Sequence, residues 1–319
     1  MQGSRVVADT TGAFADFGPY VPSVTARGTV AFQATTRDGR TGVYAWDGER
    51  TAVVAQEGAA HGPIVSHPDV QDDGWTSYYA ETTGGGGVFA ARAGVVVPLA
   101  TPSHNGLRAG PLGPTMARGR VAFRASRGDA PGVWLASTDG VVPVAERGFA
   151  GFEGLPVVDD AGSVVFRADD AVYRWRNGVV TAVVRVGGAI GALQRFPSQA
   201  GAVWVGGARA DGAPVIVTVN EEVTLAPATG FQSVRTVLAT SSGTLWFFAT
   251  PASGGIGLYR GLDPDADRVI ALGDPLNGDP IVDFAANPVS ARGRWLALRV
   301  RTARGYQAIL RLEAQAAAG

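Results

Sequence analysis

The sequence predicts an all-β protein, folded as one closed β-propeller of seven four-stranded blades that spans residues 1–319. Three observations lead there. A repeat recurs seven times at spacings of 39 to 50 residues, and about 40–50 residues is what a four-stranded blade and its turns require. The composition combines 45 Gly and 19 Pro with 46% hydrophobic residues, which is typical of short strands and tight turns. Finally, a strand at the N-terminus supplies the one that the last repeat lacks.

A glycine in a tight turn marks each repeat, and alternating apolar residues follow it as the predicted second strand. The seven glycines are Gly28, Gly74, Gly119, Gly162, Gly201, Gly243 and Gly293. Six repeats open their first strand with a proline, where no ladder donor is needed. The aromatic residues of the second strands are Phe32, Tyr78, Phe123, Phe166, Trp204 and Trp246. Since they recur three or four residues after the marker glycine, we predict that they pack between blades.

The third and fourth strands of several repeats are joined by two-residue hairpin signals, such as Asp139-Gly140 and Asn177-Gly178. If the first strand is innermost, the second–third turns and the fourth–first connections lie on one face, which we call the long-loop face. The fourth–first connections are long in this interpretation. Long loops on a rigid scaffold tend to carry function.

The two ends of the chain are predicted to close the ring. The last repeat has three strands and finishes near Leu312, which leaves residues 313–319 as a tail. The gap from a fourth strand to the next turn glycine is 17 to 21 residues in six places and 20 from Ala8 to Gly28. Residues 5–8 therefore behave as a fourth strand, and pairing them with the last blade removes an open edge. A six-bladed ring is the alternative, and it requires the fifth and sixth repeats to merge.

Composition excludes several classes of protein. A formal net charge of −1 gives no general attraction to nucleic acid. Without cysteine there are no disulfides, thiol nucleophiles or thiolate metal sites, and no stretch approaches the roughly 20 apolar residues of a membrane span. All 27 basic residues are arginine, which we attribute to a GC-rich bacterial genome rather than to anion recognition. We expect a monomer without a cofactor.

The first residues lack the apolar segment of a signal peptide. We therefore expect either a cytoplasmic protein or one whose leader has been removed, in which case a secreted or periplasmic location is favoured.

The repeat resembles the TolB-type, WD40-like propeller repeat. Residues 22–32 carry the frame of that repeat, from a proline to an apolar strand ending in Phe32, and residues 156–162 are close to it. The resemblance covers nearly the whole chain. It implies a scaffold used mainly to bind proteins or peptides, and sometimes to carry a hydrolase domain.

Polar residues just before each inner strand are predicted to rim the mouth of the central channel, which is the default pocket. The candidates are Tyr20, His67, His104, Arg108, Glu153, Arg195, Arg235, Asp283 and Asn287. We predict that a protein, peptide or glycan binds there without chemistry. Arg108, Arg195 and Arg235 either hold an anionic group together by charge-assisted hydrogen bonds or are three separate loop residues.

An enzyme is the alternative, because all three histidines (His61, His67 and His104) fall in these connections. It would be an exported carbohydrate-active lyase or hydrolase that uses His67 or His104 with arginine and carboxylate partners. Glu153 and Asp283 are a weaker acid–base pair, because their repeats are three blades apart. Asp69 is the only carboxylate close to the histidines, so we predict no metal site. No Gly-x-Ser-x-Gly or His-Glu-x-x-His motif occurs, which favours binding over catalysis.

Two pairs of neighbouring carboxylates resemble cation loops. They are Asp72-Asp73 and Asp159-Asp160, each in the tight turn before a marker glycine. Asp side chains commonly accept hydrogen bonds from the backbone of such turns. We interpret both pairs as turn residues.

Overall fold

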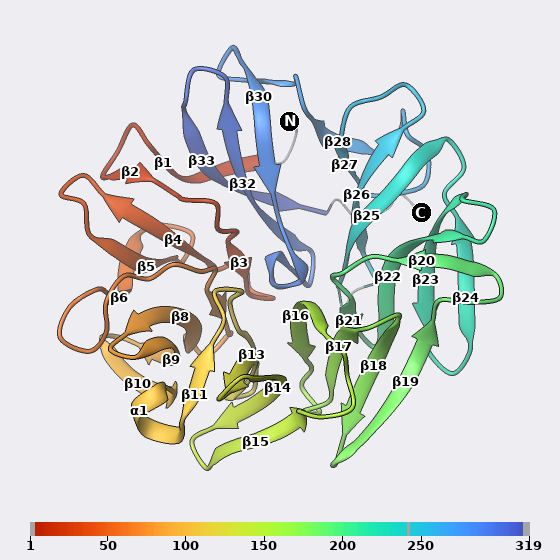
Figure 1. Ribbon diagram of the computed structural model, residues 1–319. Coiled ribbons are helices and arrows are strands. Elements are labelled where there is room, and N and C mark those ends of the chain that lie inside the picture. The colour runs from red at the N-terminus through yellow and green to blue at the C-terminus, as the bar shows by residue number, and fades with distance from the viewer. Residues whose placement is uncertain (1–3, 241–242, 315–319) are drawn as a thin grey trace.

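Short antiparallel sheets surround a central axis in the computed structural model, which describes residues 4–240 and 243–314 (Figure 1). The helices of this part of the chain are two short segments, α1 (Pro102–Asn105) and η1 (Pro288–Ser290). Neither of them is long and apolar enough to cross a membrane. The all-β propeller arrangement predicted from the repeat is confirmed.

Each sheet runs from inner strands at the axis to an outer strand at the rim. The strands of the first half of the chain are β1 (Ser4–Asp9), β2 (Phe14–Asp16), β3 (Ser23–Val24), β4 (Val30–Thr36), β5 (Thr41–Trp46), β6 (Thr51–Gln56), β7 (Asp69–Val70), β8 (Thr76–Thr82), β9 (Gly85–Arg92), β10 (Val95–Ala100), β11 (Leu107–Ala109), β12 (Thr115–Ala117), β13 (Arg120–Arg127), β14 (Ala130–Ser137), β15 (Gly140–Ala145), β16 (Phe152–Val158) and β17 (Val164–Ala168).

The strands of the second half are β18 (Ala171–Arg176), β19 (Val179–Arg185), β20 (Ile190–Leu193), β21 (Ser198–Ala200), β22 (Ala202–Arg209), β23 (Pro214–Val219), β24 (Val223–Pro227), β25 (Phe231–Ala239), β26 (Leu245–Pro251), β27 (Gly257–Tyr259), β28 (Arg268–Ala271), β29 (Pro275–Leu276), β30 (Asp279–Ala285), β31 (Ala291–Arg292), β32 (Trp295–Thr302) and β33 (Gln307–Glu313). Strands β7–β15 form one sheet, in which the single pair Ala109–Gly86 joins β11 to β9.

Most inner strands are broken in the middle, which differs from the sequence interpretation. In the first sheet, β2 and β3 both pair with β4, at opposite ends of it. The same division separates β11 from β12, β20 from β21 and β30 from β31, whereas β16 and β25 are continuous but bulged. The first half of each broken inner strand was predicted to be part of the connection from the preceding fourth strand. Those connections are therefore shorter than expected. We call the residues between two halves an inner-strand break.

Aromatic rings from second and third strands stack within the sheets. The stacked pairs are Phe32 with Tyr44, Tyr78 with Phe89, Phe166 with Tyr173 and Phe247 with Tyr259, with ring centroids 5.6 to 5.9 Å apart. The predicted packing role is confirmed for Phe32, Tyr78, Phe123, Phe166 and Trp246, which are buried. Trp204 is only half-buried, because the neighbouring Val205 takes the buried position in that strand.

The N-terminal strand completes the last sheet, as predicted for residues 5–8. Strand β1 pairs antiparallel with β33 from Ser4–Leu312 to Asp9–Ala308, with a bulge near Val7. Strand β33 ends at Glu313 and Ala314 is buried, so these two residues do not belong to the predicted tail. Residues 315–319 lie outside the described residues.

A stack of arginine and tryptophan side chains strengthens this closure. The Arg311 guanidinium carbon lies 4.7 Å from the ring centroid of Trp46 and 4.1 Å from that of Trp295. Arg5 of β1 also lies over Trp46, at 4.7 Å. Since Trp46 belongs to β5 and Arg311 to β33, the stack joins the first and last sheets. Cation–π contacts of this kind each contribute roughly 0.5–1 kcal/mol at exposed sites.

Deleting residues 1–9 should lower the free energy of unfolding by about 3 kcal/mol or more, because β33 becomes an unpaired edge and apolar cover is lost. Urea denaturation of both proteins measures the difference. Within β1, Val7→Asp should be destabilising since Val7 packs on the core, whereas Val6→Asp, at a site 44% exposed, should be tolerated. Equal stability of the truncated and intact proteins would contradict closure by β1.

Candidate functional site

Hydroxyl side chains at the start of several inner strands link neighbouring sheets around the axis. Each of these residues directly follows a proline, and its oxygen accepts a backbone N–H from the next inner strand. The pairs are Ser23 with Val70, Thr115 with Val158 and Ser198 with Ala239, each at 3.1 Å. Buried backbone donors need such partners. We call these linking side chains, together with Asp69, the polar ring.

Asp69 takes the same position in β7 and places a charge in the ring. Its Oδ2 accepts the Met116 N–H at 2.6 Å, as the hydroxyls do elsewhere. Its Oδ1 lies 3.3 Å from Nη2 of Arg292 in an ion pair. The Asp69 side chain is completely buried, and this burial raises its pKa to about 6 although Arg292 and the Met116 N–H oppose the rise. Sequence analysis had considered Asp69 only as a possible metal ligand.

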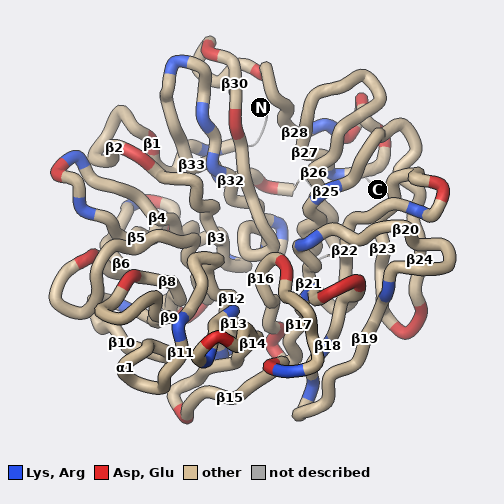
Figure 2. The backbone as a smooth tube through the Cα atoms, viewed as in Figure 1, with Lys and Arg blue, Asp and Glu red and all other residues tan. Residues whose placement is uncertain are grey.

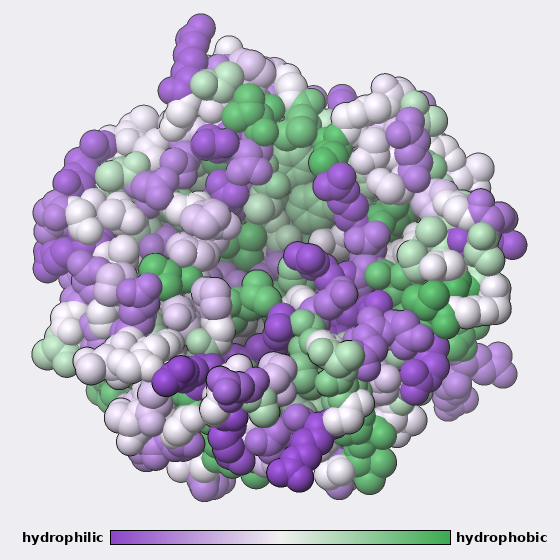
Figure 3. All heavy atoms as spheres, viewed as in Figure 1, coloured by the Kyte–Doolittle hydropathy of each residue, from purple (hydrophilic) through white to green (hydrophobic). Residues whose placement is uncertain are grey.

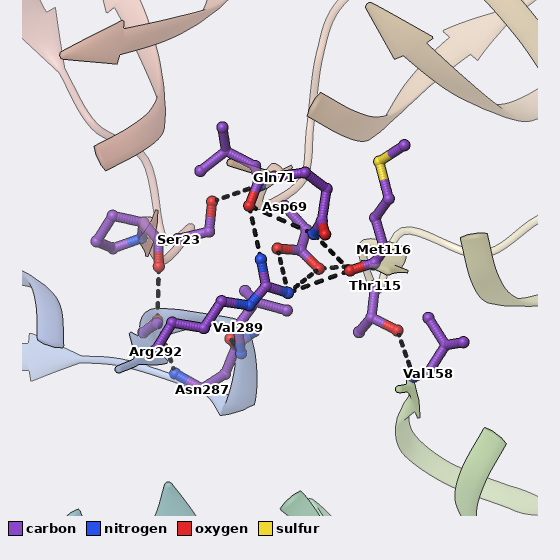
Figure 4. Close-up of polar contacts among 12 residues, drawn as sticks. Ser23, Asp69, Gln71, Thr115, Met116, Val158, Asn287, Val289 and Arg292 are labelled. Atoms are coloured by element: carbon purple, nitrogen blue, oxygen red, sulfur yellow. Dashed lines mark hydrogen bonds and ion pairs between the residues drawn. The ribbon is translucent and has the colours of Figure 1, made fainter. Parts of the chain in front are cut away.

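Arg292 reaches from β31 to the inner strands β7 and β12 (Figure 4). Its Nη1 donates to the Val70 carbonyl at 2.7 Å, and its Nη2 donates to the Met116 carbonyl at 3.1 Å. Gln71 donates to the same Met116 carbonyl. We call Asp69, Gln71, Met116 and Arg292 the axial cluster. It ties the last sheet to β7 and β12, which precede it by more than 170 residues.

The axial cluster forms part of the wall of a cavity of about 440 Å³, which we call the axial cavity. Residues of the inner strands or of the turns that follow them line it on every side: Ala26, Asp69, Thr115, Val158, Gln199, Ala239 and Ala291. Because first–second turns contribute to it, this cavity lies toward the face opposite to the long-loop face. This cavity was not predicted from the sequence. The available signal was an aspartate where three other repeats carry serine or threonine after the proline.

On the long-loop face, the structure brings Glu153 and Arg195 together around Arg124. The Nη1 of Arg124 donates to the Gly154 carbonyl at 3.2 Å. Burial lowers the pKa of Arg124, the Glu153 charge raises it, and the Arg195 charge lowers it further. Arg124 was not predicted, because it lies in a second strand. Figure 2 shows acidic and basic residues interspersed around the centre of the ring, and Figure 3 shows that this centre is hollowed.

Gly154 allows this arrangement. Its backbone is left-handed, with φ of +59°, and a Cβ there would lie 2.0 Å from the Arg195 carbonyl oxygen. Only glycine fits such a close approach of two backbones. The bulge of β16 and the break between β20 and β21 therefore touch, and the side chains of Glu153 and Arg195 remain exposed.

The remaining predicted site residues have different settings. Arg108 on β11 and Arg235 on β25 are exposed. Asp283 on β30 forms an ion pair with the buried Arg299 at 2.7 Å. Asn287 is buried and caps η1 by accepting the Val289 N–H at 3.0 Å. Burial raises the pKa of Tyr20, and the nearby Glu81 and Tyr79 raise it further.

The three histidines lie in three separate environments. His61 Nε2 is 2.9 Å from the Tyr78 hydroxyl, in the core. His67 is buried in an inner-strand break, and burial lowers its pKa to about 4. His104 is exposed on α1 at the rim of the ring (Figure 1). Across residues 4–240 and 243–314, no group of three or more histidine, aspartate or glutamate side chains is placed to hold a metal ion.

The turn interpretation of the carboxylate pairs is confirmed for one residue of each pair. Asp73 accepts the Trp75 N–H at 3.1 Å, and Asp159 accepts the Ser163 N–H at 2.8 Å. Asp159 also accepts a hydrogen bond from Gln199 at 2.6 Å, which turns its carboxylate toward the axial cavity.

No protein-family model and no curated protein matches the chain. Solved structures do match it. The β-propeller domain of the Trilobed protease from Pyrococcus furiosus, described as having an open velcro topology, is 12% identical with a TM-score of 0.61, and 95% of each chain is covered. A puromycin-hydrolyzing peptidase from Mycobacterium tuberculosis is 16% identical with a TM-score of 0.60. That match covers 93% of this chain but 51% of the peptidase, so the chain spans about half the peptidase's length.

The WD40 β-propeller domain of Doa1 is 12% identical with a TM-score of 0.52, over 97% of each chain. At these identities the three likenesses show the fold alone. They confirm the WD40-like propeller that the repeat predicted. Unlike the open topology described for the Pyrococcus domain, this ring is closed by β1.

Replacing Arg292 by methionine should destabilise the protein by about 3 kcal/mol, because Asp69 would remain buried without its ion-pair partner. Asp69→Ser introduces the residue type found at Ser23 and Ser198, so adding it to Arg292→Met should recover most of the loss. A double-mutant cycle in urea at pH 7.5 measures this coupling. Arg50→Met, which removes an arginine that is 86% exposed, is the control. Additive effects of the two changes would contradict the coupling.

The raised pKa of Asp69 predicts a specific pH dependence. The contribution of Asp69 to stability is fully present below pH 3.8, the ordinary pKa of an aspartate. It is lost as pH rises through about 6, the pKa of Asp69 in the folded protein, because between these values the folded protein holds a proton that the unfolded chain has released. Between pH 4.5 and 7.5, the intact protein should therefore lose on the order of 2 kcal/mol relative to Asp69→Asn. His67, with a lowered pKa, acts in the opposite direction over the same range, but it is common to both proteins and cancels. Parallel pH profiles of the two proteins would refute the assignment.

Proposed function

We propose that this chain is a seven-bladed, monomeric β-propeller that binds a protein, peptide or glycan on its long-loop face without carrying out chemistry. The blade number is supported by dividing the sheet β7–β15 at its single joining pair, Ala109–Gly86. It is also supported by the lining of the axial cavity, which includes residues from seven successive inner strands or the turns after them. A monomer is supported by ring closure within one chain.

The observation that carries the proposed function is a set of exposed charges around the axis that have no ion-pair or hydrogen-bond partner among the described residues. Arg108, Glu153, Arg195 and Arg235 all lie on inner strands or their breaks and are exposed. Among the residues that the structure describes, none of these four side chains makes an ion pair or a hydrogen bond. Several ion pairs of the described residues instead satisfy charges locally, as Arg40 and Asp38 do. Charges of both signs held on a rigid ring suit a polar partner surface.

Binding is better supported than the carbohydrate-active enzyme. That enzyme would need His67 or His104 beside arginine and carboxylate groups. His67 is buried, and His104 lies on α1 at the rim. The matching structures include the WD40 β-propeller domain of Doa1 and the β-propeller domain of the Trilobed protease, and the exposed charges without ion-pair partners favour binding.

The test is binding of the intact chain to arrays of synthetic peptides and of oligosaccharides, followed by affinity measurement with the strongest probe. The double variant Arg195→Ala/Arg235→Ala should bind that probe at least about tenfold more weakly, which corresponds to about 1.4 kcal/mol of binding free energy. Arg50→Ala/Arg118→Ala removes two exposed arginines from the opposite face and should leave affinity unchanged. The same affinity in both double variants would reject this placement. Turnover of an oligosaccharide that is lost in His67→Ala or His104→Ala would reject the non-catalytic function.

A further inference from the structure

We infer that the axial cavity is a second binding site, which takes a small organic cation bearing several N–H donors, such as a polyamine or a guanidinium compound. This inference goes beyond the proposed function, because the cavity lies toward the face opposite to the long-loop face. It rests on the size of the cavity, the charge of its wall and one acceptor atom, on Gln199, that the wall leaves unfilled.

The cavity has the dimensions of a small-molecule site. Its volume of about 440 Å³ falls in the range of roughly 300–1,000 Å³ that ligand pockets occupy. Inner strands, the turns that follow them and the short segment η1 form the wall, and the polar ring fixes those strands relative to one another. A ligand would therefore enter a preformed site, which lowers the ordering cost of binding.

The wall is strongly acidic. Four carboxylates line the cavity, those of Asp69, Asp72, Asp159 and Asp160, against one arginine, Arg292. The ion pair with Asp69 already compensates the Arg292 charge. Asp160 lies 3.6 Å from Arg118, but both side chains are more than 70% exposed, so this pair contributes little. An anionic ligand would meet uncompensated carboxylates, whereas a concave wall of one sign attracts cations.

The hydrogen-bond acceptors of the cavity wall indicate which kind of cation can bind there. Asp159 accepts the Nε2 of Gln199 at 2.6 Å, and since a carboxylate only accepts, the other amide atom of Gln199 must be its oxygen. That Oε1 atom is buried and has no hydrogen-bond partner among the described residues. The Oδ1 of Asp69 meets the Arg292 charge, and its completely buried side chain is closed to a ligand. Since an unfilled buried acceptor is costly, the Gln199 oxygen favours a ligand that brings N–H donors.

A bare metal ion fits less well. Within residues 4–240 and 243–314, no three carboxylate or histidine side chains converge on a point where one ion could be held. The four aspartates instead spread over β7, the turn that follows it and the turn after β16. Spaced charges of this kind match a chain of amines, or a planar guanidinium with a basic tail, better than a point charge.

The experiment is calorimetric titration of the intact chain with spermidine and with agmatine at pH 7.5 and low salt. Glutamate serves as an anionic probe. Saturable binding of at least one amine with one site, and none of glutamate, is expected. The double variant Asp72→Asn/Asp160→Asn should bind the amine at least about tenfold more weakly. Asp139→Asn, which removes an exposed carboxylate outside the axial cavity, should leave the affinity for the amine unchanged.

A further variant distinguishes a built site from general charge attraction. Gln199→Leu keeps every charge but removes the unfilled acceptor, so it should weaken amine binding several-fold, and circular dichroism reports whether it remains folded. Arg195→Ala/Arg235→Ala should bind the amine as tightly as the intact chain, which separates this site from the long-loop face. Absence of saturable amine binding, or equal affinity in Asp72→Asn/Asp160→Asn and Asp139→Asn, would overturn the inference.

Discussion

The pairing of β1 with β33 is the constraint on which the other features of this propeller depend. It joins residues about 300 positions apart in the chain, and the Arg311–Trp46 stack holds the same joint at the rim. Closure also reaches the axis, where the Ser290 hydroxyl donates to the Pro22 carbonyl at 2.6 Å. The axial cluster can form only if the sheet that carries Arg292 stays fixed beside the first sheet. Loss of the terminal strand would therefore disturb the axis as well as the rim.

The breaks in the inner strands give the ring two different ends. The first halves and the breaks carry exposed charges on the long-loop face, whereas the second halves carry the polar ring and the axial cavity. Glycine allows close backbone contacts between neighbouring sheets on this face. A Cβ at Gly206 of β22 would lie 2.1 Å from the Arg235 carbonyl oxygen of the bulged strand β25, much as Gly154 meets Arg195. These contacts leave the charged side chains outside. One packing constraint thus accounts for both the rigidity of the ring and the exposure of its charges.

Local signals explain what the sequence could predict. Glycine turns, alternating strands and the gap between Ala8 and Gly28 are all visible in short windows, and the closure by β1 follows from them. The first halves of the inner strands were missed because they are short and end at Gly or Pro, as at Gly110-Pro111, which indicates a loop. The contact between Asp69 and Arg292 spans 223 residues, and no local pattern reveals it. Trp204 was assigned to the core because a tryptophan is more conspicuous than the neighbouring Val205.

The presence of a buried ion pair at the axis needs a reason other than stability. Serine and threonine do the same linking work at three other positions of the polar ring, without the cost of burying a charge. What the Asp69 carboxylate adds is a partner that fixes the Arg292 guanidinium against the wall and neutralises it. With that one positive charge compensated, Asp72, Asp159 and Asp160 determine the potential inside the axial cavity. The ion pair therefore gives the cavity its acidic character, and a polar ring made only of hydroxyl groups would leave Arg292 as an unpaired cation in the same space.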